Sequence, residues 1–199
     1  YHSRHTQHLY AMPFGTLRIA KPLPSIAKMR IRKNKLMDSY LEMMSFDFQG
    51  KSVELPSDLE RLINREFLNE NDCIILKGLY ENDQNPKFET DFEKCEWESN
   101  ETHFHPDEYA KQQTNDLEFL ILALESSKRL GTRLKQSFPN KKFRISLSFA
   151  ETQKNNQGEM EFYGASTVRF YQIRNSCENK MRIDDLNEYE LEAVLEIEI

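Results

Sequence analysis

Apolar and polar side chains alternate most regularly in the C-terminal third of the chain. In residues 142–150 (KFRISLSFA) every second side chain is apolar, and residues 189–199 (YELEAVLEIEI) repeat that pattern. Residues 158–174 form a third such stretch, in which Gly164 indicates a bulge or a kink. A period of two places one row of side chains in a core and the other row in water. We therefore expect three antiparallel strands, with the polar loop 151–158 joining the first two.

Residues 115–138 follow a different period, because their apolar side chains recur at helical spacing. Six residues carry this spacing: Leu117, Leu120, Ile121, Leu124, Leu134 and Phe138. The pattern predicts a long amphipathic helix that ends at Pro139 and covers the apolar face of the sheet. Gly131 costs about 1 kcal/mol relative to alanine inside a helix. It indicates either that a strand approaches closely there or that the last turns begin there.

Three shorter patterns precede this helix. Residues 46–55 alternate aromatic and polar side chains around a glycine and predict a short strand or hairpin. Ser57 and Glu60 form a capping box before apolar residues at helical spacing, which predicts a short helix. Residues 73–80 are a compact apolar run and predict a strand that is covered on both faces. Together these elements predict an α+β fold: an antiparallel sheet, made of the C-terminal three-strand meander and additional N-terminal strands, covered on one face by the long helix, with one further short helix.

Charge divides the chain into two parts. Residues 1–36 contain eight basic residues and no acid, so residues 37–199 carry a net charge of −14 within the overall −6. Three interpretations of residues 1–36 compete: a basic arm for nucleic acid, a targeting segment, or sequence upstream of the true start, with Met37 beginning the folded domain. We favour the third. We expect a basic tail at 1–36 outside the core and a single acidic α+β domain at 37–199.

Composition excludes several classes of protein. The mean hydropathy is −0.74, and no apolar run approaches the roughly 18 residues of a membrane-spanning helix. The three cysteines show no C-x-x-C spacing, so we expect no disulfide framework and a reducing, cytoplasmic location. The acidic body repels nucleic acid, which leaves residues 1–36 as the part able to bind it. We expect no cofactor.

Residues 81–108 combine acidic and aromatic side chains. They contain ten acids against two lysines, and they include the single tryptophan. Carboxylates increase the rate of association with a basic protein, and an aromatic anchor contributes affinity. The candidate partner-binding residues are Glu89, Asp91, Glu93, Glu96, Trp97, Glu98 and Glu101. The alternative is that Phe88, Phe92 and Cys95, which are spaced i, i+4, i+7, face the core from a short helix whose acids are merely solvated.

The pair His103 and His105 suggests a second kind of site. On an extended chain the two rings of an H-x-H pair point to one side, as zinc ligands do, but a zinc site needs three or four ligands. Alternatively His105 caps a helix that begins at Pro106, and the carboxylates of Asp107 and Glu108 interact favourably with the positive N-terminal end of that helix. The sequence contains none of the common glycine-rich phosphate-binding, metalloprotease or nucleophile-elbow motifs.

The sequence therefore predicts a non-enzymatic acidic binding protein that engages a basic protein partner, in the manner of an immunity protein or an inhibitor. The alternative is a metal-dependent hydrolase or nuclease that uses His103 and His105. A nucleic-acid binder acting through residues 1–36 is a third and weaker hypothesis. The surplus of carboxylates and the lack of catalytic motifs both favour the first.

Overall fold

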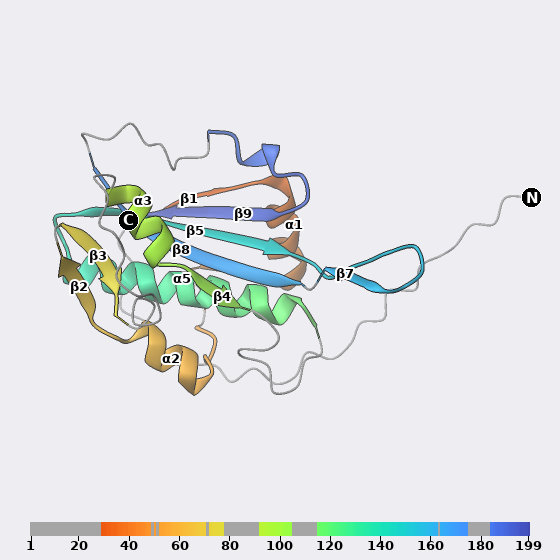
Figure 1. The fold of residues 1–199 in the computed structure, drawn as a ribbon, viewed down its shortest axis with the longest axis horizontal. Coiled ribbons are helices and arrows are strands. Elements are labelled where there is room, and N and C mark those ends of the chain that lie inside the picture. The colour runs from red at the N-terminus through yellow and green to blue at the C-terminus, as the bar shows by residue number, and fades with distance from the viewer. Residues whose placement is uncertain are drawn as a thin grey trace, which may run out of the picture.

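The computed structural model describes residues 29–48, 50, 52–70, 72–77, 92–104, 115–162, 164–174 and 184–199. Its centre is a five-stranded antiparallel sheet in the order β1-β9-β5-β8-β4 (Figure 1). These strands are β1 (Arg30–Lys33), β4 (Thr102–Phe104), β5 (Lys142–Ala150), β8 (Ala165–Ile173) and β9 (Ala193–Glu198). Two further strand pairs are β2 (Phe67–Glu70) with β3 (Cys73–Leu76), and β6 (Gln153–Lys154) with β7 (Met160–Phe162).

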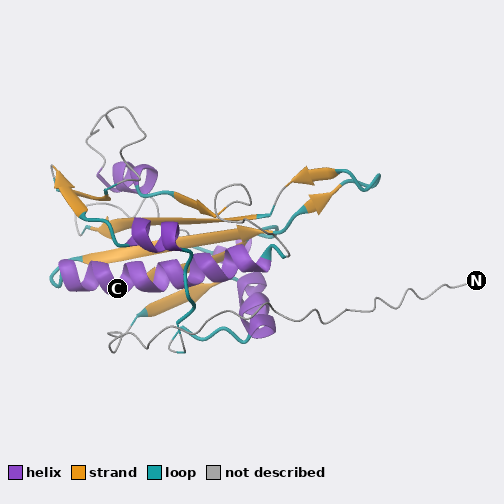
Figure 2. Cartoon of the chain, turned by 90° about the horizontal axis from the view of Figure 1, so that it is seen from below, coloured by secondary structure: helices purple, strands orange, loops and turns teal. Residues whose placement is uncertain are grey.

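The helices lie on both sides of this sheet. They are α1 (Lys35–Met44), α2 (Ser57–Ile63), α3 (Phe92–Ser99) and α5 (Leu117–Ser137), with a short 3-10 helix, η1 (Leu186–Glu188). The long helix α5 runs along one face of the sheet, which we call the inner face (Figure 2). This confirms the predicted α+β class with one long covering helix. Among the described residues, no helix is both long and apolar enough to cross a membrane.

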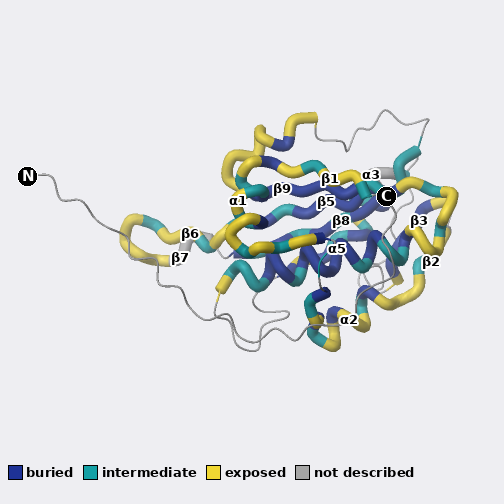
Figure 3. Tube along the Cα trace, turned by 180° about the vertical axis from the view of Figure 1, so that it is seen from behind, coloured by how far each residue is buried: buried dark blue, intermediate teal, exposed yellow. Residues whose placement is uncertain are grey.

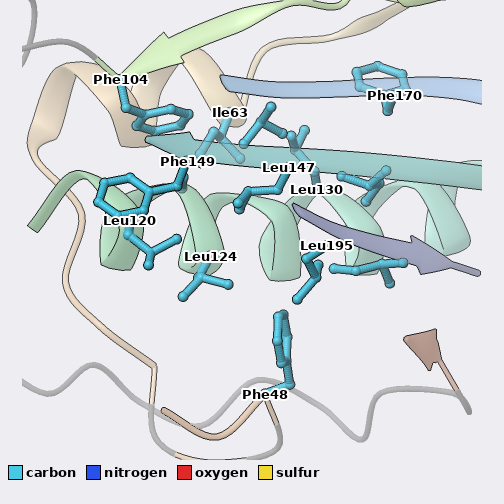
Figure 4. Close-up of a cluster of buried hydrophobic side chains, with 14 of the residues drawn as sticks. Phe48, Ile63, Phe104, Leu120, Leu124, Leu130, Leu147, Phe149, Phe170 and Leu195 are labelled. Atoms are coloured by element: carbon cyan, nitrogen blue, oxygen red, sulfur yellow. The ribbon is translucent and has the colours of Figure 1, made fainter. Parts of the chain in front are cut away.

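The core lies between α5 and the inner face of the sheet. Strand β5 is central, and its apolar row, Phe143, Ile145, Leu147 and Phe149, is at most 1% exposed. Figure 4 shows Leu147 and Phe149 of this row beside Leu120 and Leu124 of α5. Each such side chain contributes roughly 1.5–3 kcal/mol when fully buried. Figure 3 shows the same arrangement as dark central strands within an exposed rim.

Gly131 marks the closest approach of α5 to the sheet. A Cβ atom at this position would lie 3.0 Å from Met29 Cε, 3.5 Å from Ile145 Cδ1 and 3.6 Å from Ile199 Cγ2. The helix continues to Ser137, so the glycine does not mark its last turns. The first of the two predicted explanations, a close strand, is therefore correct.

The long strand predicted over residues 158–174 is two strands that are separated at Gly164. A Cβ atom on Gly164 would lie only 2.5 Å from the carboxylate of Asp116, which precedes α5. That carboxylate accepts a hydrogen bond from the backbone N–H of Thr152 at 2.7 Å. The chain therefore passes from the β6–β7 hairpin into β8 at a position where only a glycine fits.

The predicted strand over residues 46–55 is wrong, because this segment is an irregular loop against α5. Two of its carbonyl groups accept hydrogen bonds from side chains of α5. Lys128 Nζ donates to the Gly50 carbonyl at 3.0 Å, and Arg129 Nη2 donates to that of Val53 at 2.7 Å. The capping box of α2 is also absent, since Pro56 is the N-cap and Ser57 is the first helical residue. The apolar run at residue 73 does form a fully buried strand, β3.

Residues 30–36, which the sequence assigns to the tail, form part of the sheet and of α1. Strand β1 pairs with β9, so β9 lies inside the sheet and β1 forms its edge. The side chain of Asn34 caps α1 by accepting from the backbone N–H of Met37 at 2.9 Å. The prediction failed here because β1 has four residues, three of them basic, and lacks an apolar row. Residues 1–28 lie outside the described part.

Candidate functional site

A small pocket lies on the outer face of the sheet, the face that points away from α5. The alternation that buries Leu147 and Val168 sends their neighbours Ser146 and Thr167 to this face. The pocket has a volume of about 90 Å³, and we call it the outer-face pocket. It is lined by Trp97, Ser146, Ser148, Thr167, Arg169, Tyr189, Glu192 and Val194.

Three hydroxyl groups from the adjacent strands β5 and β8 line this pocket. Ser148 lies directly opposite Thr167 in the strand register, and Ser146 lies opposite Arg169. Ser146 is only 7% exposed, and its side chain lines the pocket. Its hydroxyl can donate one hydrogen bond and accept others, so it is suited to a bound polar group.

Trp97 and Arg169 form one wall of the pocket. The Trp97 ring packs edge-on against Tyr171, with ring centroids 5.7 Å apart. The guanidinium of Arg169 lies 5.1 Å from the centroid of the Trp97 ring. It also donates to both oxygens of Glu101, from Nε at 3.1 Å and from Nη2 at 2.8 Å. The positive charge of Arg169 is therefore balanced within the protein.

An acidic stretch, residues 184–192, forms the opposite wall. It contains five carboxylates and no basic residue, and we call it the acidic segment. Leu186 anchors it at 4% exposure, whereas every other residue of the segment is exposed. Figure 3 shows it as a mostly yellow stretch beside β9. Tyr189 is 40% exposed and Leu191 is 76% exposed, so two large apolar side chains stand among the carboxylates.

Side chains near β1 and α1 fix the backbone of the acidic segment. Asn34 Nδ2 donates to the carbonyls of Tyr189 at 3.1 Å and Glu192 at 2.7 Å. Arg32 Nη2 donates to the carbonyl of Asp184 at 2.8 Å. The hydrogen bonds that Asp185 accepts from Asn187 lower the pKa of that carboxyl group and keep it ionised. The segment is therefore held in place before any partner binds.

The charged side chains of the outer face next to the pocket are buried, although the alternation of β9 predicted solvated glutamates. Glu196 is 0% exposed and Arg144 is 2% exposed. Arg144 Nη2 donates to Glu198 at 2.5 Å, and Arg32 Nη1 donates to Glu196 at 2.9 Å. Burial lowers the pKa of Arg144, but the bond to Glu198 and the nearby Glu196 outweigh it, so the net pKa is raised. These acids serve the sheet itself and are not available to a partner.

The structure separates the seven predicted partner-binding residues into groups. Trp97 lines the outer-face pocket, and Glu101 supports it through Arg169. Glu98 is exposed on α3. Glu89 and Asp91 lie outside the described residues, as does the side chain of Glu93.

Glu96 is wrong as a surface residue, because it is 0% exposed. Its Oε1 accepts from the backbone N–H of Ile74 at 2.7 Å, and its Oε2 accepts from that of Gln172, also at 2.7 Å. Arg174 donates to both oxygens, at 2.8 and 2.9 Å. Four hydrogen bonds to this one carboxylate thus join α3 to β3 and to the end of β8. Cys95, at 7% exposure, faces the core as the alternative interpretation expected, but Glu96 is not one of the solvated acids of that interpretation.

The predicted histidine pair does not form a metal site among the described residues. No group of three or more His, Cys, Asp or Glu side chains is placed there to hold a metal ion. His103 Nε2 lies 2.6 Å from Glu101, and its Nδ1 lies 3.3 Å from the Thr167 hydroxyl. His105 lies outside the described residues. His103 therefore supports the wall of the outer-face pocket.

Sequence reasoning missed the hydroxyl row and the acidic segment. Ser146 and Ser148 occupy the polar row of β5, which was interpreted as a solvated face. The signal in residues 184–192 was five acids among nine residues, interrupted by Tyr189 and Leu191. The two features meet only after β9 pairs with β5 and brings Val194 opposite Ser148.

A model of the uncharacterized protein PM0498 family matches residues 32–199. The chain belongs to that family. The match to the PM0498 family runs from within β1 to the last residue of the chain and includes every residue of the outer-face pocket and the acidic segment. No curated protein and no solved structure matches the chain. The family's description names no activity, so the function is inferred from the geometry of this site.

Proposed function

We propose that this protein is a non-enzymatic binding protein that engages a basic protein partner through the acidic segment, residues 184–192. One observation carries the proposal: Tyr189 and Leu191 are exposed among five carboxylates on a backbone that is fixed at both ends. Among the described residues, only two other large hydrophobic side chains, Ile31 and Met43, are similarly exposed. An immunity-like or inhibitor-like role is one form of this function, in which the protein covers the partner's basic surface.

The chemistry of the segment supports such a partner. Exposed carboxylates attract a basic surface over a distance of about 8–10 Å at moderate salt and so increase the rate of association. Apolar side chains in the centre of an interface contribute most of the affinity. Because the segment is already fixed by Asn34 and Arg32, little conformational entropy is lost on binding. The site thus differs from the predicted one at residues 89–101, but it keeps the predicted partner class.

Affinity purification of the full chain from its native host tests this function. Three baits are compared: the wild type, the acidic-segment variant Glu188→Gln/Glu190→Gln/Glu192→Gln, and a matched control, Glu42→Gln/Glu54→Gln/Glu66→Gln. Both variants lose three exposed carboxylates, but the control residues lie outside the acidic segment and the pocket. We expect a protein of basic isoelectric point to be retained by the wild type and the control and lost by the acidic-segment variant.

Measurement of the dissociation constant with that purified partner then gives a magnitude. Each exposed charge pair contributes roughly 0.2–1 kcal/mol, so loss of three carboxylates weakens binding about tenfold. The affinity also falls as the salt concentration rises. If all three baits retain the same proteins, or if the partner that depends on the segment is acidic, the proposed function is wrong.

A further inference from the structure

We propose that the outer-face pocket receives the guanidinium group of an arginine side chain. The inference rests on the proposed function, since the arginine belongs to the basic partner that the acidic segment binds. Glu192 belongs to both features, because it is the last residue of the segment and also lines the pocket. A partner that covers the segment therefore reaches the pocket directly.

The size of the pocket limits the ligand to a single side-chain group. Its volume of about 90 Å³ is well below the roughly 300–1,000 Å³ of a site for a drug-sized molecule. It is nevertheless larger than the roughly 10–15 Å³ that one water molecule needs by the same kind of measure. A planar group of a few heavy atoms fits this space.

The polar atoms of the pocket match the donors of a guanidinium group. Guanidinium has five N–H donors and no acceptor, so its site must supply acceptors in several directions. The hydroxyls of Ser146, Ser148 and Thr167 can all accept hydrogen bonds, and the carboxylate of Glu192 adds a charged acceptor. Ser146 is the most enclosed of these four residues, because it is only 7% exposed.

Two aromatic side chains favour a planar cation over a compact one. Trp97 and Tyr189 both line the pocket, from α3 and from the acidic segment. Arginine stacks on aromatic rings more readily than lysine does, and it keeps its charge at every relevant pH.

Arg169 does not convert the pocket into an anion site. Its guanidinium is held by both oxygens of Glu101, so its charge is balanced. Glu192 lines the same space, and the acidic segment places four more carboxylates on that side of the molecule. The charge that remains around the pocket is negative and favours a cation over a phosphate.

Titration of the full chain with small probes tests the inference without a partner. Trp97 is the single tryptophan, so its fluorescence reports directly on the pocket. The probes are N-acetyl-arginine amide, N-acetyl-lysine amide, the neutral isostere N-acetyl-citrulline amide, and inorganic phosphate. We expect a saturable change with the arginine probe, about tenfold weaker binding of the lysine probe, and no saturation with citrulline or phosphate.

Matched variants show whether binding occurs in the pocket. Glu192→Gln removes the carboxylate that lines it, and Ser146→Val removes the buried hydroxyl and fills part of the space. Glu42→Gln is the control, because it removes the same charge from an exposed residue outside both the acidic segment and the pocket. We expect at least about fivefold weaker arginine binding for Glu192→Gln and little change for Glu42→Gln. Circular dichroism checks that the Ser146→Val variant is folded. If it is not folded, Glu192→Gln provides the test alone, because it changes an exposed residue.

The possible results separate this inference from the proposed function. Saturation by phosphate, equal binding of arginine and lysine, or equal effects of Glu192→Gln and Glu42→Gln would each overturn the guanidinium site. So would the absence of any fluorescence change. If the probes fail while the basic partner still depends on the acidic segment, the proposed function stands and the pocket inference is wrong. If arginine binds but no basic partner depends on the segment, the proposed function fails.

Discussion

At the scale of single residues, burial decides the chemistry of Cys73. Cys73 is the first residue of β3, is 0% exposed and packs beside Cys95 of α3. Burial, followed by the neighbouring Cys95 and the charge of Glu96, raises its pKa from 9.0 to about 12. The thiol is therefore neutral at physiological pH and is a poor nucleophile. Its position indicates a role in packing α3 against the β2–β3 hairpin.

The raised pKa of Cys73 predicts a loss of stability in alkaline solution. Above about pH 9 the unfolded chain releases the thiol proton and the folded chain keeps it. The free energy of unfolding then falls as the pH rises towards 12, by up to about 1.4 kcal/mol per pH unit. Urea denaturation under reducing conditions measures this slope, and Cys73→Ala makes it shallower by about that amount. Tyr40, whose pKa burial also raises, contributes equally to both proteins. Equal slopes would contradict the role of Cys73.

Glu96 shows why sequence alone did not locate the site. Ten acids lie between residues 81 and 108, and nothing local distinguishes Glu96, which is buried, from the others. Its burial depends on Arg174, which is 78 positions away, and on backbone groups of two strands. By contrast Trp97 was singled out from the sequence and does line the outer-face pocket, because a single large aromatic among acids is a local signal.

At the scale of elements, regular periods were predictable and irregular segments were not. Strands β5 and β9 and helix α5 each carry an apolar row that packs in the core, so their period is visible in the sequence, although much of the polar row is buried as well. The loop over residues 46–55 also alternates, yet its carbonyls bond to α5. A period describes which side chains can be buried, whereas only the fold determines the partner of each backbone group. Prediction of the outer-face pocket likewise requires the register of β5, β8 and β9, which the period of each strand does not give.

Gly164 connects three elements and offers a test at this scale. Gly164→Ala brings a methyl group to about 2.5 Å from the Asp116 carboxylate, and something must move. We expect a loss of about 1–3 kcal/mol, because the hydrogen bond between Asp116 and Thr152 is displaced. Denaturation of a double-mutant cycle with Asp116→Ala measures the coupling. The loss from Gly164→Ala should be at least about 1 kcal/mol smaller when Asp116 is already alanine, and additive losses would refute the contact.

At the scale of the whole molecule, the sheet has two different faces. The inner face packs on α1 and α5 and forms the apolar core. The outer face carries buried ion pairs, the pocket and α3, and α3 is attached both by polar contacts of Glu96 and Asn100 and by the small apolar cluster of Cys73, Ile75 and Cys95. The polar contacts are directional, so they help to fix Trp97 at the pocket. The proposed binding surface is therefore on the face that contributes least to the core.

This division predicts how unfolding should depend on Glu96. In the wild type, Trp97 fluorescence and the helical circular dichroism signal, which α5 dominates, should report one urea midpoint. Glu96→Gln removes the carboxylate that accepts two hydrogen bonds from Arg174, whose side chain is 8% exposed, and breaking such a buried pair costs about 3–5 kcal/mol. Because that pair holds α3 and not α5, the Trp97 midpoint should fall below the circular dichroism midpoint. Glu98→Gln, on the exposed side of α3, should change stability by less than about 0.5 kcal/mol and keep the midpoints together. If Glu96→Gln lowers both signals equally, α3 and the core unfold as one unit, and the pocket wall cannot open independently of the fold.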